Sequence, residues 1–291
     1  FTVLPNITGF SSSSGIVGDV RTINGSAFTG ATAVQFNGVS AAFSVTSSTA
    51  ISATVPSGAT TGSVTVTTAA GTATSATNFT VTPTVSSFSP TSGAVGASIT
   101  INGQAFTGAT NVAFNGTNAS FSIVSNTQLT ATVPSGATTG TIVVTTPSGS
   151  GTSATSFTVT ASISSFTPSS GIIGSSVVIT GTAFTGATFC RFNGTASVFT
   201  VDSYTQITAT VPAGATTGLI SVTTAAGTVN SASNFSVLPS ITGFSSSSGI
   251  VGDVRTINGS AFTGATTVTF NGVSASFSVT SSTAISATVP S

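Results

Sequence analysis

Only seven side chains in this sequence have the types that usually carry acid–base, metal-binding or redox chemistry. They are three arginines, three aspartates and one cysteine, and Lys, Glu and His are absent: Arg21, Arg191, Arg255, Asp19, Asp202, Asp253 and Cys190. General acid–base catalysis needs a group that titrates near the working pH, and a Ser or Thr nucleophile needs an activating base. Because the sequence offers neither, it predicts a protein that is not an enzyme.

The same composition argues against metals, cofactors and several classes of partner. Calcium takes six to eight oxygen ligands, usually from several carboxylates, and the three aspartates are too few and too far apart. A formal net charge of zero lacks the basic excess that nucleic acids and anionic membranes attract. No apolar run approaches the roughly 18 residues of a membrane-spanning helix. We therefore expect no metal, no cofactor, no nucleic acid partner and no membrane insertion.

These few residues are set in a strict 78-residue repeat. The phrase AFTGAT occurs four times, and its phenylalanine marks the spacing at Phe28, Phe106, Phe184 and Phe262. No insertion or deletion shifts this register. The sequence predicts residues 1–3 as the last strand of a preceding repeat, followed by four repeats: repeat 1 (4–81), repeat 2 (82–159), repeat 3 (160–237) and an incomplete repeat 4 (238–291).

Each repeat reads as a series of short strands with alternating apolar residues. In repeat 2 the expected strands are 85–90, 98–106, 111–116, 119–125, 128–134, 140–146 and 154–159. Asn-Gly and Pro-Ser-Gly turns separate them. About seven alternating strands in under about 100 residues predict an all-β fold of tandem Ig-like sandwiches. Because no Gly/Ser linker separates one repeat from the next, we also expect a semi-rigid, rod-like chain.

The repeated motifs resemble the IPT/TIG family of Ig-like domains. The residues that carry the resemblance are the segment I-x-x-F-x-P-x-S-G-x-x-G, the segment I-x-G-x-x-F-T-G-A-T-x-V-x-F-N-G, and the phrase A-T-V-P-x-G-A-T-T-G before a final F-T-V. The resemblance implies an Ig-like β-sandwich without catalytic residues. Such modules occur as spacers of bacterial secreted and surface proteins, in receptor ectodomains and in DNA-binding transcription factors. The basic loops of the DNA-binding branch are missing here.

Residues that interrupt the repeat are the candidate site residues. Cys190 takes the inward slot of Val34 and Val112, which predicts a buried thiol, with an interchain disulfide as the alternative. Arg191 takes the neighbouring outward slot. Asp202 and Tyr204, two residues apart, are expected on one strand face, where they could meet Arg191 across the sheet or across a subunit contact.

Asp19 and Arg21 also share a strand face, although Arg21 stands in an inward slot that Ile99 and Val177 fill in other repeats. Either Arg21 reaches out from the strand end or the strand shifts. A local surface pair and an inter-unit contact are the two interpretations. The candidate contacts between subunits are therefore Asp19, Arg21, Arg191, Asp202 and Tyr204.

Sequons of the type N-x-[ST] are frequent because the chain is rich in Ser, Thr and Asn. The candidate glycosylation sites are Asn6, Asn24, Asn115 and Asn193.

The sequence ends at Ser291, before the last two strands that the other repeats contain. Two explanations are open: a window on a longer repetitive chain, or end-to-end exchange of strands between copies. The function that the sequence predicts is structural, namely an extracellular filament or cell-surface appendage built by end-to-end and lateral packing. Its partner would be other copies of itself. The alternative is an adhesin stalk or carbohydrate-binding surface module whose partners are surface glycans.

Overall fold

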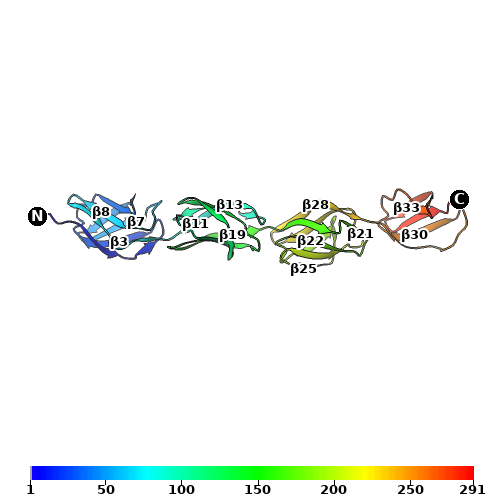
Figure 1. Ribbon diagram of the computed structural model, residues 1–291, viewed down its shortest axis with the longest axis horizontal. Coiled ribbons are helices and arrows are strands. Elements are labelled where there is room, and N and C mark those ends of the chain that lie inside the picture. The colour runs from blue at the N-terminus through cyan, green and yellow to red at the C-terminus, as the bar shows by residue number, and fades with distance from the viewer. Residues whose placement is uncertain (1) are drawn as a thin grey trace. The chain divides into compact units, whose positions relative to one another are not determined.

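A computed structural model describes residues 2–291, and every regular element in that range is a β-strand (Figure 1). Phe1 lies outside the described residues, and Thr2–Pro5 form no strand, so the strand expected at 1–3 stays a prediction. The chain divides into two compact units, one ending at Val159 and the other beginning at Thr160.

Repeat 2 shows the full architecture of two facing sheets. One sheet has the order β11-β13-β17-β16 and the other β12-β19-β18-β14-β15. Neighbours are antiparallel except β12 and β19, which pair in parallel. The strand bounds are β11 Thr84–Ser89, β12 Ser92–Gly93, β13 Ser98–Gln104, β14 Asn111–Phe114, β15 Thr117–Ala119, β16 Phe121–Ser125, β17 Gln128–Thr132, β18 Gly140–Thr146 and β19 Gly149–Val159.

Repeats 1 and 3 repeat this pattern. Repeat 1 differs in that its last strand is broken in two, so that β10 pairs separately with β2. The strand bounds of repeat 1 are β1 Asn6–Phe10, β2 Ser14–Gly15, β3 Val20–Ser26, β4 Ala33–Phe36, β5 Val39–Ser40, β6 Phe43–Ser47, β7 Ala50–Thr54, β8 Val64–Thr68, β9 Gly71–Thr74 and β10 Thr80–Val81. The strand bounds of repeat 3 are β20 Ser162–Thr167, β21 Ser170–Gly171, β22 Ser176–Thr182, β23 Phe189–Phe192, β24 Thr195–Ala196, β25 Phe199–Ser203, β26 Gln206–Thr210, β27 Gly218–Thr224 and β28 Gly227–Val237.

Repeat 4 keeps one complete sheet, β29-β30-β34-β33, and only two strands of the other, β31-β32. Its strand bounds are β29 Ser240–Phe244, β30 Val254–Ser260, β31 Thr269–Phe270, β32 Val273–Ser274, β33 Phe277–Ser281 and β34 Ala284–Thr288.

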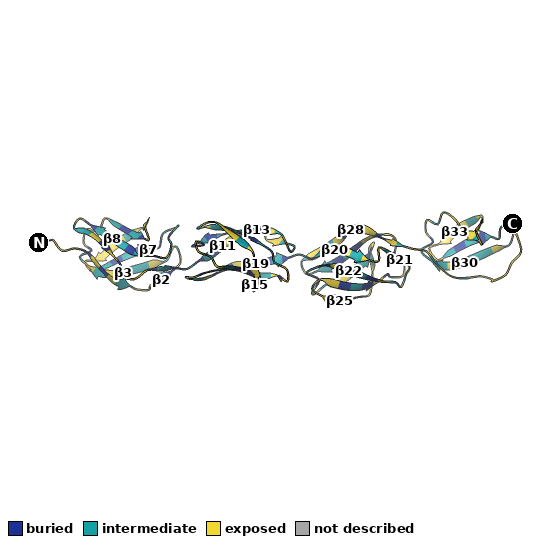
Figure 2. Ribbon diagram, viewed as in Figure 1, coloured by how far each residue is buried: buried dark blue, intermediate teal, exposed yellow. Residues whose placement is uncertain are grey.

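The core of each intact repeat follows from alternation along its strands (Figure 2). In repeat 2, Ile99 and Ile101 of β13 are fully buried, whereas the alternating Ser98 and Thr100 face outward. Phe157 of the last strand packs edge-to-face on Phe114, with ring centroids 5.1 Å apart. Contacts of this kind add about 0.5–1.5 kcal/mol to simple burial. Phe157 also packs on Phe88 of β11 in the facing sheet, with ring centroids 6.1 Å apart, so these rings connect the two sheets.

The glycine of the G-x-x-F motif makes room for its phenylalanine. A Cβ at Gly103 would overlap the Phe106 ring and the Thr84 carbonyl oxygen. Gly25, Gly181 and Gly259 occupy the same position in the other repeats. The motif recurs because neither the ring nor the neighbouring strand can approach a larger residue.

One expected strand is divided in the structure. The segment predicted as a strand at 119–125 contains the end of β15 and all of β16, which belong to different sheets. The chain crosses from one sheet to the other at Ser120. Ile123, which the alternation placed inside, is 42% exposed because β16 is an edge strand. Alternation along this segment is therefore not enough to predict burial at Ile123.

Candidate functional site

The described residues hold no arrangement suited to metal or acid–base chemistry. No group of three or more His, Cys, Asp or Glu side chains gathers anywhere in residues 2–291. No helix in that range is long and apolar enough to cross a membrane. The features that remain are two ion pairs, a buried thiol, the outer faces of repeat 3, a groove in repeat 4 and the joint between repeats 1 and 2.

Asp19 and Arg21 form a local pair at one end of the repeat 1 sandwich. The Arg21 Nη2 lies 2.5 Å from the Asp19 Oδ2, and the Arg21 Nε donates to the Ser14 carbonyl oxygen at 3.1 Å. The Asp19 carboxylate also accepts the Ile16 N–H at 3.0 Å. The Arg21 guanidinium therefore turns toward the loop that ends the sandwich, although its slot is buried in repeats 2 and 3.

Repeat 4 reproduces this arrangement with Asp253 and Arg255. The Arg255 Nη2 lies 2.5 Å from the Asp253 Oδ2, and the Ile250 N–H donates to the same oxygen at 3.1 Å. Both pairs are internal to one repeat and are about one quarter to one third exposed at their side chains. A contact between subunits at Asp19 and Arg21 stays a prediction.

Cys190 is buried in the core of repeat 3, with 1% of its surface exposed, as expected for its slot. It packs among residues such as Phe192, Val222 and Phe235. Desolvation raises the pKa of its thiol from 9.0 to about 12. A thiol that is inaccessible and protonated cannot act as a nucleophile, and its burial opposes the alternative of an interchain disulfide.

Arg191 lies on the outer face of the sheet that contains β23. Its guanidinium lies 5.0 Å from the centre of the Phe189 ring, and its Nη1 donates to the Gly194 carbonyl oxygen at 3.4 Å. Phe189 itself is 49% exposed. The result is an outward-facing aromatic ring with a cation beside it.

Asp202 and Tyr204 are not brought to Arg191 within the same chain. Asp202 lies on β25 of the opposite sheet and accepts a hydrogen bond from the Thr208 hydroxyl at 2.7 Å. Tyr204 follows the end of β25, where burial raises the pKa of its phenol. The expectation that Asp202 and Tyr204 share a strand face is wrong, because β25 ends between them at Ser203.

The candidate glycosylation sites differ in their surroundings. The side-chain amides of Asn115 and Asn193 donate to Thr138 and Thr216 hydroxyls, each at 2.8 Å. Both asparagines adopt a left-handed φ of 44° in the turn between two strands. A glycan on either nitrogen would compete with the bond that fixes this turn. Asn6 and Asn24 are exposed, and glycosylation there stays a prediction.

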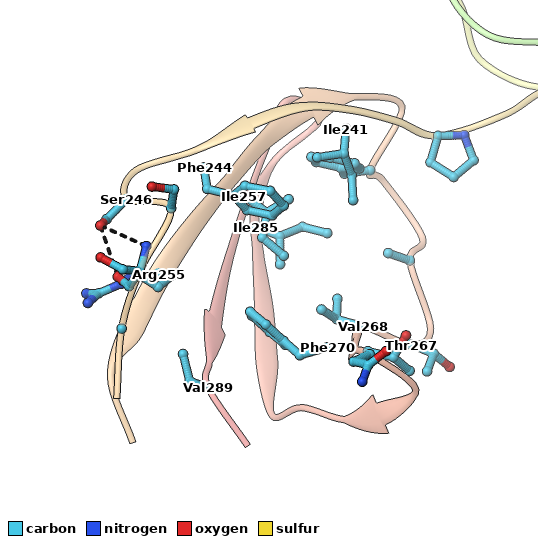
Figure 3. Close-up of a pocket in the computed structure, with 18 residues that line it drawn as sticks. Ile241, Phe244, Ser246, Arg255, Ile257, Thr267, Val268, Phe270, Ile285 and Val289 are labelled. Atoms are coloured by element: carbon cyan, nitrogen blue, oxygen red, sulfur yellow. Dashed lines mark hydrogen bonds between the residues drawn. The ribbon is translucent and has the colours of Figure 1, made fainter. Parts of the chain in front are cut away.

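Repeat 4 contains an open apolar groove of about 830 Å³. Figure 3 shows Phe244, Ile257, Phe270 and Ile285 around it. In repeat 3 the equivalent space is filled by β27 and β28, whose Phe235 packs on Phe192 at 5.1 Å between ring centroids. In the described range repeat 4 has no strands equivalent to β27 and β28, so the groove is the uncovered half of its sandwich core.

The joint between repeats 1 and 2 is short and packed. Only Thr82 and Pro83 separate β10 from β11. The Thr82 N–H donates to the Gly15 carbonyl oxygen of repeat 1 at 3.0 Å, and the Thr61 hydroxyl lies 2.7 Å from the Ser148 hydroxyl of repeat 2. Ala105 of repeat 2 is part of the repeat 1 core. These contacts fix the two repeats to each other.

Four outward residues of repeat 3 were not singled out from the sequence. They are apolar or aromatic where other repeats have smaller or polar residues: Phe189, Val198, Leu219 and Val178. A slot-by-slot comparison of the four repeats contains this signal. Apolar residues are too common in the chain, however, for these four to stand out without knowledge of which face they occupy.

Two-sheet Ig-like sandwiches that follow one another along the chain, with no group of three or more His, Cys, Asp or Glu side chains in residues 2–291, define a modular all-β protein. The IPT/TIG domain matches residues 5–81, 83–159 and 161–237. The chain therefore belongs to the IPT/TIG family, and the predictions of this family and of tandem Ig-like sandwiches are confirmed. No curated protein matches the sequence.

Several solved structures are similar to parts of this chain. One, determined with a xylogluco-oligosaccharide, is 20% identical, with 88% of this chain and 74% of that chain covered and a TM-score of 0.36. The surface glycan-binding protein PbSGBP-B from Prevotella bryantii is 19% identical, with coverages of 54% and 42% and a TM-score of 0.35. The extracellular region of plexin A4 is 16% identical, with coverages of 99% and 29% and a TM-score of 0.27. This chain thus spans less than two thirds of the last two, and at these scores the likenesses bear on neither its ligand nor its partner.

Proposed function

We propose that this protein is an extracellular structural protein whose tandem Ig-like repeats build a filament or cell-surface appendage. In this proposal its partner is other copies of the same chain, which pack end to end and side by side. Its role is mechanical: the repeats transmit force through their joints, and their outer faces hold neighbouring copies together.

The fixed joint between repeats 1 and 2 is the observation that carries this proposal. Thr82 is hydrogen-bonded to repeat 1, and Pro83 lies against repeat 2, where a Cβ at Gly151 would come within 2.6 Å of the Pro83 carbonyl oxygen. A flexible linker would leave both repeats free to reorient. A two-residue connection that is hydrogen-bonded to one repeat and packed closely against the next suits a chain that must keep its repeats in a defined register.

The outer faces support the same role. Charged residues make up 2% of the chain, and four of the six are joined in pairs within their own repeats. A surface with so little net charge offers little repulsion between copies, and near-zero net charge promotes association. The Ser, Thr and Asn residues that dominate the outer strand positions can hydrogen-bond to equivalent residues of a neighbour.

Negative-stain electron microscopy and sedimentation velocity of the wild-type protein over a range of concentrations test the proposal. We expect regular filaments or bundles and a sedimentation coefficient that rises with concentration. Monodisperse monomers at every concentration would contradict it.

An insertion tests the contribution of the joint. Four residues, Gly-Gly-Ser-Gly, placed between Thr82 and Pro83 should leave the repeats folded and make the assemblies shorter or irregular. The same insertion between Thr29 and Gly30, in an exposed loop of repeat 1, is the matched control and should leave the assemblies unchanged. Equal effects of both insertions would show that the joint does not contribute specifically to assembly.

A second candidate is an adhesin stalk or carbohydrate-binding surface module. The observation that favours it is the exposed ring of Phe189 beside the Arg191 guanidinium, since exposed aromatic side chains often mark interaction sites. A glycan array probed with the wild-type chain and with Phe189→Asn, the residue of repeat 2, tests this candidate. Binding that depends on Phe189 would favour it, and an array without signal would remove it.

The extracellular location is part of the proposal. Antibody labelling of intact cells that produce the protein should reach the repeats without permeabilisation. Labelling that appears only after permeabilisation would contradict an extracellular or cell-surface role.

A further inference from the structure

The six charged side chains of the chain fall into two groups. Asp19 with Arg21 and Asp253 with Arg255 form ion pairs within repeats 1 and 4. Arg191 and Asp202, both in repeat 3, form no ion pair with any residue in the described range. One cation and one anion of the same repeat are therefore left facing solvent.

Arg191 belongs to an apolar patch on the outer face of one sheet. Phe189 and Arg191 alternate with the buried Cys190 and Phe192 along β23. Arg191 is in register with Ala196 of β24, the edge strand of the same sheet. Leu219 lies on the same outer face in β27, since Ile220 and Val222 point inward. We name Phe189, Arg191 and Leu219 the cationic face.

This composition is specific to repeat 3. The equivalents of Phe189 are Ala33, Asn111 and Thr267, and the equivalents of Leu219 in repeats 1 and 2 are Ser63 and Thr141. No equivalent of Arg191 is charged. The inward positions of the same strands are buried and apolar, as in the other intact repeats. Folding therefore does not require these changes on the surface.

Asp202 belongs to the outer face of the opposite sheet. Its carboxylate accepts the Thr208 hydroxyl, and Thr208 is in register with Val178 of β22. Thr208 alternates with the buried Ile207 and Ala209, so its side chain and Asp202 face outward. Val178 replaces a threonine found in the other repeats at Thr22, Thr100 and Thr256. We name Val178, Asp202 and Thr208 the acidic face.

The two faces point away from each other, because they are the outer surfaces of the two sheets of one sandwich. Arg191 and Asp202 of one copy therefore cannot meet. The cationic face of one copy is complementary in charge to the acidic face of a second copy. We propose that copies of this chain associate front to back through repeat 3, with the cationic face of one copy on the acidic face of the next.

The chemistry of the two faces supports this orientation. A two-fold contact would place Arg191 against Arg191 or Asp202 against Asp202, which is unfavourable in a nearly apolar interface. The front-to-back contact pairs the charges and covers Phe189 and Leu219 with a face that Val178 makes less polar. Because each copy uses two different surfaces, the association stays open and can continue to further copies. This inference rests on the proposed self-assembly and names the surface that would carry its lateral part.

Charge reversal tests the contact with two single variants. Arg191→Asp makes both faces acidic, and Asp202→Arg makes both faces cationic. We expect each variant alone to associate at least about tenfold more weakly than the wild type in sedimentation velocity, because like charges then meet. The double variant Arg191→Asp/Asp202→Arg has complementary faces again and should recover association.

Mixing the two single variants gives the sharpest result. The face changed by Arg191→Asp in one variant is complementary to the face changed by Asp202→Arg in the other. The two unchanged faces carry the wild-type Asp202 and Arg191 and are complementary as well. The mixture should therefore associate although neither component does so alone. Gln35→Asp, in the equivalent slot of repeat 1, is the control and should behave as the wild type. Far-UV circular dichroism checks that each variant is folded.

The outcomes separate this inference from the proposed function. Association of the single variants at the wild-type level, or a mixture that stays dissociated, would overturn the front-to-back contact and leave self-assembly intact. A wild-type protein that never associates would overturn both. Glycan binding lost in Phe189→Asn, together with association that charge reversal does not change, would assign the cationic face to a sugar instead.

Discussion

Repeats 1 and 3 have equivalent cores but different outer faces. Ile23, Phe28 and Phe79 of repeat 1 correspond to Ile179, Phe184 and Phe235 of repeat 3, and all six are buried. On the surface, Ala33 and Gln35 of repeat 1 give way to the ring of Phe189 and the guanidinium of Arg191, while Asp202 takes the place of Thr46. Repeat 1 joins its charges in an internal pair, and repeat 3 presents one on each side. The cores therefore maintain the fold, and the outer faces distinguish one repeat from another.

The largest loss of stability should come from removing a core phenylalanine, and it should be equal in repeats 1 and 3. Phe79→Ala and Phe235→Ala each remove a buried ring that packs edge-to-face on a second phenylalanine at 5.1 Å. Each substitution should lower the free energy of opening of its own repeat by about 3–5 kcal/mol. Hydrogen exchange followed by mass spectrometry resolves the repeats separately. A loss below about 1 kcal/mol in either repeat would show that the two cores are not equivalent.

High pH should lower the stability of repeat 3 but not that of repeat 1, which has Val34 at the position of Cys190. The Cys190 thiol has its pKa raised to about 12 by burial, so the folded state keeps its proton while the unfolded state loses it above 9.0. The stabilising contribution is complete below pH 9 and is lost as pH rises from 9 toward 12, at about 1.4 kcal/mol for each pH unit. At about pH 10.5 the expected loss is about 2 kcal/mol.

Cys190→Val, which installs the residue of repeats 1 and 2, is the matched control for this pH dependence. It should remove most of the loss in repeat 3. Tyr204 contributes in the same direction, because burial also raises its pKa. Tyr204→Phe added to Cys190→Val should remove the remainder. A pH profile of hydrogen exchange that Cys190→Val leaves unchanged would contradict the buried thiol as its cause.

A smaller effect concerns the Asp19–Arg21 pair, which replaces the Ser175 and Val177 of repeat 3. Arg21 occupies a slot where Val177 is fully buried, so its charge is partly desolvated. Replacing such a pair by well-packed apolar residues is often neutral or stabilising. Asp19→Ser/Arg21→Val should therefore change the stability of repeat 1 by between zero and about +1 kcal/mol. A decrease of more than about 1 kcal/mol, measured by hydrogen exchange, would show that the pair holds the end of the sandwich.

The smallest effect should come from exchanging outer faces. Ala33→Phe/Gln35→Arg gives repeat 1 part of the cationic face without changing any fully buried core side chain. Surface substitutions of this kind usually stay within about ±0.5 kcal/mol. Thermal unfolding and hydrogen exchange of repeat 1 should match the wild type within that margin. A larger loss would mean that the faces take part in folding.

The sequence predicts the fold well because the same signals recur in every repeat. Alternation along 98–106 gives the buried Ile99 and Ile101, and the recurring G-x-x-F motif identifies Phe106 as a core ring. The slot of Cys190 likewise predicts its burial, because the equivalent Val34 and Val112 are apolar. These inferences need only local periodicity and the comparison of one repeat with another.

The candidate site was harder to predict because it depends on which sheet each strand joins. Asp202 and Arg191 lie on different sheets of repeat 3 because β25 pairs with β26 and β23 pairs with β27. The division of 119–125 between two sheets has the same origin, since a crossing between sheets leaves the alternation of residues almost unchanged. Periodicity gives the inward side of a strand, but it does not give the sheet to which the strand belongs.

The most direct test of the account is a disulfide trap between copies that keeps Arg191 and Asp202 in place. In a Cys190→Val background, one chain carries Ala196→Cys, beside Arg191, and another carries Thr200→Cys, on the strand of Asp202. Ser40→Cys and Ser44→Cys, at the equivalent positions of repeat 1, form the control pair. On mild oxidation of the mixture, front-to-back association predicts a predominant disulfide between the Ala196→Cys chain and the Thr200→Cys chain. Disulfides formed only between identical chains, or no more of them than in the control pair, would contradict the account.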